Sequence, residues 1–97
     1  RGELIKISDK TEVISDNVTD LTKVEGSDGI AFLAGEEIYV LESDRVMKIF
    51  DSSTLTDVVY ARKKYYLSDE SGVLWEIKNK GKEKKSLGNT EIYILVE

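Results

Sequence analysis

The sequence predicts a single small all-β domain. Its apolar residues come in short runs with period two, such as Ile38-Tyr39-Val40-Leu41, and the runs are rich in β-branched and aromatic side chains. Gly, Asp, Ser and Asn residues bound each run, as they do in turns between strands. No stretch of ten or more residues keeps a helical stripe, and the chain has no Pro to interrupt a ladder. These observations predict that the 97 residues form an antiparallel meander.

An internal repeat of about 35 residues organises the predicted strands. A shift of 35 residues lays residues 2–8 on 37–43, and a second such shift lays both on 72–78. A second signature is a threonine followed by an acidic and an aliphatic residue, and it recurs at Thr19-Asp20-Leu21, Thr56-Asp57-Val58 and Thr90-Glu91-Ile92. Features that recur together at one period indicate tandem copies of one supersecondary unit.

Four short strands in about 40 residues are the dimensions of a β-propeller blade. The chain therefore resembles β-propeller repeats of the broad WD40, NHL and YVTN kind, without the signature of any one family. The resemblance implies antiparallel four-stranded blades that run from an inner strand A to an outer strand D. The strands that it implies are 2–8 (C), 10–15 (D), 19–25 (A), 29–34 (B), 37–42 (C), 45–51 (D), 56–61 (A), 64–69 (B), 72–77 (C), 83–87 (D) and 90–96 (A).

The same resemblance divides residues 1–97 into segments of one propeller unit. They are an incomplete blade at 1–17, complete blades at 18–53 and 54–88, and a lone inner strand at 89–97. About two complete blades plus one incomplete blade are too few to close a ring, so apolar sheet faces and strand edges would stay open. We therefore expect the ring to be completed by a homo-oligomer or by another polypeptide, and a dimer, with about six blades, is favoured.

Charge and composition exclude several classes of function. Lys and Arg number 14 and Asp and Glu number 19, so the net charge of −5 argues against binding to nucleic acid or to an anionic membrane. The chain has no Cys and no His, so the commonest nucleophile, general base and metal ligands are missing. We expect no enzyme activity, no cofactor and no metal site.

The sequence says less about where the protein acts. No apolar run approaches the roughly 20 residues that span a bilayer. This pattern favours a soluble, cytoplasmic protein without identifying the compartment. Because the chain begins at Arg1 and not at Met, we expect that it is processed, trimmed or cut from something longer.

The repeat places three acids at equivalent positions, and these are the first candidate binding residues. If the propeller resemblance holds, Asp20, Asp57 and Glu91 lie at the starts of successive inner strands and form an acidic rim at the central channel. Such a ring would bind a cation or a basic segment of a partner. The structural alternative is that Thr and Asp at a strand start close a turn through side-chain hydrogen bonds to the backbone.

Loops and aromatic residues supply the remaining candidates. Glu36, Glu70 and Ser71 lie in predicted B–C loops, where a small ligand or a glycan could bind. Trp75 is expected to be mostly buried in strand 72–77, so that its truncation to Ala would cost about 3–5 kcal/mol. A basic run at 78–85 fits a solvated outer strand better than a phosphate site, because no aromatic residues interrupt it.

Two functions remain open at this stage. The favoured one is a non-catalytic propeller scaffold, a protein-interaction module that assembles through its open sheet faces. The alternative is a lectin-like propeller that binds a small ligand or a glycan.

Overall fold

The structure, a computed structural model, describes residues 2–96, which form nine β-strands and no helix. The predicted all-β class is thereby confirmed, and no helix is available within these residues to cross a membrane. Arg1 and Glu97, at the ends of the outermost predicted segments, lie outside the described residues. The strands are β1 (Gly2–Ile7), β2 (Thr11–Glu25), β3 (Ile30–Ala34), β4 (Glu37–Glu42), β5 (Arg45–Asp51), β6 (Val58–Ala61), β7 (Lys64–Ser68), β8 (Leu74–Lys78) and β9 (Glu83–Gly88).

The strands follow the order β5-β4-β3-β2-β6-β7-β8-β9, and β1 pairs with β2 off this path. Every ladder is antiparallel except the one between β2 and β6, which is parallel and joins Val24 to Val58 and Glu25 to Val59. The chain therefore contains two antiparallel four-stranded units with their first strands side by side. We name them the first meander (residues 18–51, with the second half of β2 and β3 to β5) and the second meander (β6 to β9). The N-terminal hairpin (residues 2–16) comprises β1 and the first half of β2.

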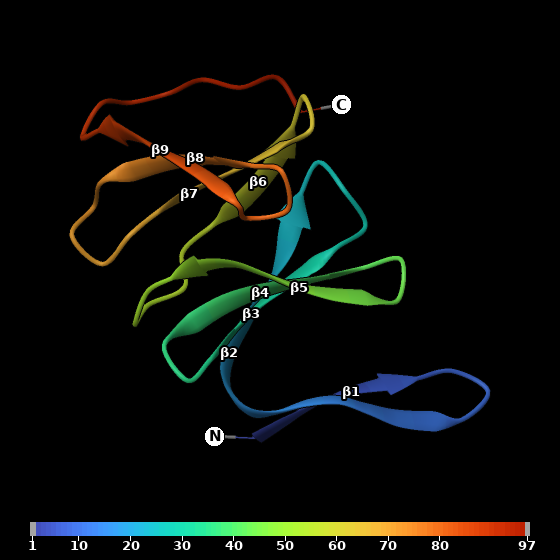
Figure 1. The fold of residues 1–97 in the computed structure, drawn as a ribbon. Helices are drawn as coiled ribbons and strands as arrows, with labels where there is room; N and C mark the ends of the chain where they lie inside the picture. Colours follow the sequence, from blue (N-terminus) through green and yellow to red (C-terminus); the bar gives the residue numbers. More distant parts are fainter. Residues whose placement is uncertain (1, 97) are drawn as a thin grey trace.

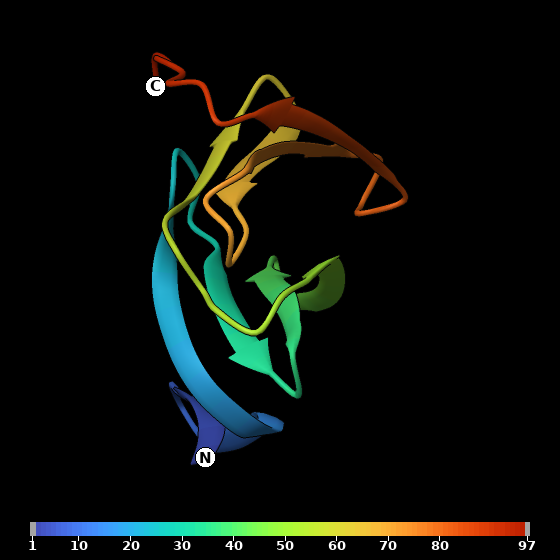
Figure 2. The same cartoon turned by 90° about the vertical axis from the view of Figure 1, so that its left-hand side faces the viewer.

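These units are stacked as three layers that curl strongly, with the first meander in the middle (Figures 1 and 2). The side chains of β3 alternate between the two faces of this middle layer. Ala31 and Leu33 belong to the core cluster shared with the second meander. Phe32 and Ala34 belong to the cluster shared with the hairpin. A sheet covered on both faces needs apolar residues at successive positions. This requirement explains the uninterrupted apolar sequence of β3.

The turns of the second meander pack closely on the first. Gly81, in the β8–β9 turn, has a φ of +86°, and a Cβ atom at this position would lie 2.5 Å from the carbonyl oxygen of Lys48 in β5. Only glycine combines this backbone conformation with so close an approach. The contact fixes how the two meanders face each other.

The predicted break between strands 10–15 and 19–25 is wrong, because both belong to the continuous strand β2. The chain does not reverse at Asp16-Asn17. Asn17 takes a φ of +58°, which Asn tolerates better than most residues, and register shifts flank it on both ladders. Each half of β2 has its own antiparallel partner, β1 or β3, so the ladders hold the strand extended and the irregularity becomes a bulge.

The predicted strand 90–96 is also wrong, since residues 89–96 form no strand. Its sequence has strong strand propensity, with Ile92, Tyr93 and Ile94 in succession. A strand also needs a neighbour with which to exchange backbone hydrogen bonds, and residues 2–96 place none beside this segment. Propensity without a ladder partner leaves it irregular.

Trp75 lies at the edge of the core between the meanders, partly buried. Its ring packs against Phe50 with the centroids 5.3 Å apart, and its indole N–H donates to Asp69 at 3.0 Å. Tyr65 and Tyr66 of β7 point to opposite faces of the sheet. Tyr65 is buried in the same core, and Tyr66 lies on the other face. Trp75 therefore packs as part of this core.

Candidate functional site

The far face of the second meander, turned away from the first, is the main candidate surface. It carries Tyr66 and Ser68 of β7, since Tyr65 and Leu67 point into the core. No strand lies against this face within residues 2–96. The irregular segment 89–96 passes over it instead (Figure 1) and encloses a depression of about 600 Å³. The lining includes Thr56, Asp57, Tyr66, Ser68, Leu74 and Glu91.

Two of the three predicted rim acids meet at this depression. Asp57, just before β6, and Glu91, in the C-terminal segment, both line it. Asp20 is exposed on β2, where its carboxylate accepts a hydrogen bond from the backbone N–H of Leu21 at 2.9 Å. Asp20 is not among the lining residues, since it lies in the first meander and the depression is on the far face of the second.

Two threonines of the repeated signature donate hydrogen bonds to the neighbouring strand. Thr19 donates its hydroxyl to the carbonyl oxygen of Leu33 at 3.4 Å, and Thr56 donates to the carbonyl oxygen of Ser68 at 3.1 Å. In each meander the motif thus joins the first strand to the end of the second. Thr90, the third copy, makes no such bond within residues 2–96, since no second strand accompanies it.

The predicted loop candidates are largely engaged in the fold. The carboxylate of Glu70 accepts hydrogen bonds from the Ser53 hydroxyl at 2.6 Å and the Ser53 amide at 2.7 Å, and these bonds lower its pKa below the ordinary value. Ser71 donates its amide to Asp69 at 2.8 Å. Glu36 lies exposed in the β3–β4 turn with a φ of +63°. All three residues are exposed, and Glu70 and Ser71 also take part in hydrogen bonds that stabilise turns.

Asp69 is the residue that organises the β7–β8 turn. Its carboxylate accepts hydrogen bonds from the Trp75 indole and from the amides of Val73 and Ser71. The Trp75 bond is the largest cause of the lowered pKa of Asp69, and the backbone amides add to it. A carboxylate that accepts several N–H bonds stays ionised.

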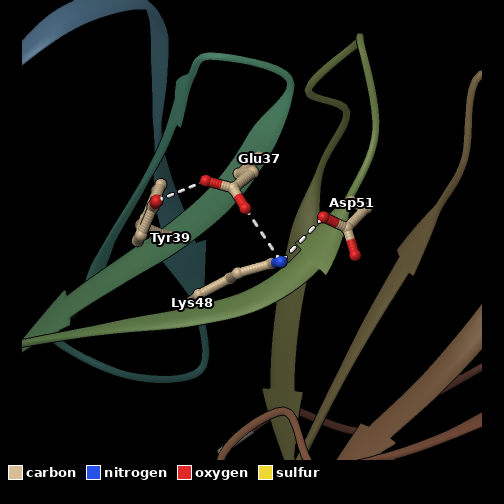
Figure 3. A network of polar contacts seen from close by, with 4 residues as sticks. All are labelled: Glu37, Tyr39, Lys48 and Asp51. Atoms are coloured by element: carbon tan, nitrogen blue, oxygen red, sulfur yellow. Dashed lines mark hydrogen bonds and ion pairs between the residues drawn. The ribbon is translucent and has the colours of Figure 1, made fainter.

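A network of charged and polar side chains lies on the hairpin-facing side of the first meander (Figure 3). The sequence pattern did not predict it. Lys48 lies 2.8 Å from both Glu37 and Asp51, and Tyr39 donates its hydroxyl to Glu37 at 2.6 Å. Lys48 lowers the pKa of both carboxyls, and they raise its own. The four residues meet only because of the β4–β5 register, which pairs Tyr39 with Lys48. The pairs are substantially exposed, so they contribute little to stability.

Exposed apolar side chains lie on both outer layers, where the sequence led us to expect open apolar sheet faces, and Leu21 and Val46 of the first meander are exposed as well. On the hairpin, Ile5 pairs with Val13, and both are exposed together with Ile7. On the C-terminal segment Tyr93 and Leu95 are exposed. The sequence of β1 indicates this exposure, because consecutive apolar residues occupy both of its faces. Leu4 is buried against the first meander, and Ile5 is turned outward.

The residues described contain no cluster suited to a metal ion. No group of three or more Asp or Glu side chains within 2–96 is placed to hold a metal ion. The chain matches no protein-family model, and neither the curated proteins nor the solved structures contain a significant match.

Proposed function

We propose that the chain is a non-catalytic β-propeller segment, a scaffold and protein-interaction module that assembles through its open sheet faces. Its partner is a second copy of the chain or another polypeptide that completes the ring. The observation that carries the proposal is the far face of the second meander, which a sheet would normally cover and which has only an irregular segment over it.

The nine strands form one curled sheet without a recognisable propeller topology, and the proposal draws only on its two four-stranded units. Successive blades are four-stranded antiparallel units with their inner strands side by side about an axis. The two meanders have this strand order, and their first strands β2 and β6 run parallel. The absence of His and Cys from the chain supports a binding role over a catalytic one.

Sedimentation velocity over about 1 to 100 µM tests the proposal, because self-association responds to concentration by mass action. We expect the mean sedimentation coefficient to rise with concentration toward that of a dimer. A compact monomer over the whole range would exclude a second copy as the partner and overturn the self-assembling form of the proposal.

The depression under residues 89–96 favours one alternative, a small-ligand or glycan-binding module. It combines hydroxyl and carboxylate oxygens from Thr56, Ser68 and Asp57 with the ring of Tyr66, and sugar sites use such a mixture of polar and apolar groups. Titration of the ¹⁵N-labelled protein with a panel of mono- and disaccharides decides the alternative. We expect shifts confined to the lining residues if it is right, and unchanged spectra at millimolar sugar would exclude it.

A further inference from the structure

The outer face of the hairpin is an exposed apolar surface. Ile5 and Val13 lie opposite each other in register, and Ile7 continues the same face of β1. Ile7 is 79% exposed. Leu4 and Lys6 point the other way, Leu4 into the core and Lys6 to an ion pair with Asp44 of the first meander. β1 also pairs only with β2, so its second edge is free within residues 2–96.

The segment 90–96 at the other end is a strand sequence without a ladder. It begins with the third copy of the Thr-acid-aliphatic motif. The first copy lies in β2, and the second copy leads into β6. Tyr93 and Leu95 are 90% and 84% exposed. Alternating apolar side chains at such exposure are costly unless a partner covers them.

These two surfaces cannot meet within one molecule. The hairpin lies at one end of the layered stack and residues 90–96 at the other, as both views show (Figures 1 and 2). The molecule is 42 Å along its longest axis, with the first meander packed between the two surfaces. Any pairing between them is therefore intermolecular.

The charges of the two ends are complementary. The hairpin, residues 2–16, carries two Lys and four Asp or Glu, whereas the second meander with the C-terminal segment, residues 58–96, carries eight Lys or Arg and five Asp or Glu. Contact between unlike ends brings opposite charges together, and contact between like ends does not. Charge thus favours contact between a head and a tail over contact between two heads or two tails.

We infer that the protein assembles head to tail with a second copy of itself. The outer face of one copy's hairpin covers the far face of the other copy's second meander, and there residues 90–96 add as a strand to the free edge of β1. This inference rests on the proposed function and specifies its partner and interface. The contact is heterologous, so each copy keeps one free end until a ring closes.

Two variants that block one end each test the geometry. Ile7→Glu places a charge on the head and Leu95→Glu places one on the tail, and both positions are exposed enough for the fold to stay intact, which circular dichroism checks. Val46→Glu, an exposed apolar position in the middle layer, is the matched control. In a head-to-tail assembly each blocked variant alone is monomeric, with affinity reduced at least about tenfold.

Mixing the two blocked variants gives the decisive result. Ile7→Glu keeps a tail and Leu95→Glu keeps a head, so we expect a 1:1 heterodimer, which native mass spectrometry identifies when one variant is ¹⁵N-labelled. Wild type and Val46→Glu should associate alike, and the ¹³Cα shifts of residues 90–96 should move to strand values on association. Raising NaCl from about 0.05 to about 0.5 M should weaken the association.

The outcomes separate this inference from the proposed function. If one blocked variant still dimerises alone, or if mixing restores no heterodimer while wild type associates, the interface is not head to tail and only the inference fails. Residues 90–96 that stay irregular in the assembly would refute the strand addition. A wild-type protein that never associates would remove this inference together with the self-assembling form of the proposed function.

Discussion

The carboxylate of Glu70 holds Ser53 by two hydrogen bonds, one from the Ser53 hydroxyl at 2.6 Å and one from its amide at 2.7 Å. The same oxygen, Oε2, also accepts from the Ser52 hydroxyl at 3.3 Å. Glu70 belongs to the β7–β8 turn, whereas the serines lie in the connection between the two meanders. The bonds therefore fasten this connection to the second meander.

Glu70→Gln should flatten the response of stability to acid. The bonds lower the pKa of Glu70 below its ordinary value of 4.5, so their contribution is complete above that pH and is lost as the pH falls through the lower folded value. We expect the variant to melt below wild type at neutral pH and the gap to close below pH 4.5. Thermal melts from neutral to acid pH measure it, with Glu36→Gln as control because Glu36 is exposed in the β3–β4 turn. A gap independent of pH would contradict the assignment.

Trp75→Ala should destabilise the fold by about 2–4 kcal/mol, because a large ring is removed from the edge and not the centre of the core. Trp75→Phe keeps the contact with Phe50 and loses the indole bond to Asp69, so it should cost about 1–2 kcal/mol. Urea unfolding measures both values. A loss below about 1 kcal/mol for Trp75→Ala would place this residue on the surface as a binding candidate.

Gly81→Ala should destabilise more than Gly72→Ala, although both glycines have positive φ, +86° and +84°. A Cβ at Gly81 meets the backbone of Lys48, whereas a Cβ at Gly72 meets nothing within 4 Å. The shared conformational penalty cancels, and the difference of about 1–3 kcal/mol reports overpacking between the meanders. Paired denaturation curves give this difference. Equal losses would mean that the β8–β9 turn does not rest on β5.

Lys48→Gln should raise the pKa values of both Glu37 and Asp51 toward their ordinary values of 4.5 and 3.8, since the cation between them is the largest cause of their lowering. Tyr39→Phe should raise the pKa of Glu37 alone, because the Tyr39 hydroxyl bonds only that carboxylate. Side-chain ¹³C titration by NMR follows each group. Unchanged titration of Asp51 in Lys48→Gln would show that the pair is not formed in solution.

Local pattern predicted most of the strands, since alternation and turn residues are properties of neighbours in sequence. The predicted ranges 37–42 and 45–51 coincide with β4 and β5, which flank the short Ser43-Asp44 turn. The predictions that proved wrong concerned features set by neighbouring strands. The continuity of β2 and the irregular course of 90–96 follow from which strands stand beside them, and propensity carries no information about that.

The candidate site divides in the same way. Asp57 and Glu91, which the repeat makes equivalent, both line the depression on the second meander. Asp20 does not line it, since Asp20 lies on β2 in the first meander. The Lys48 network needed the cross-strand register, which no sequence spacing encodes.

The double burial of the first meander has a consequence for how the molecule opens. In a stack where each layer contacts only its neighbours, stability is a sum of interfaces, and the middle layer has two while each outer layer has one. Unfolding should then proceed inward from both ends, and backbone amides of β3 and β4 should be the last to exchange with deuterated solvent. Adding further layers at either end would convert an outer layer into a middle one and slow its fraying. Longer stacks of the same unit would therefore protect even their weakest strands.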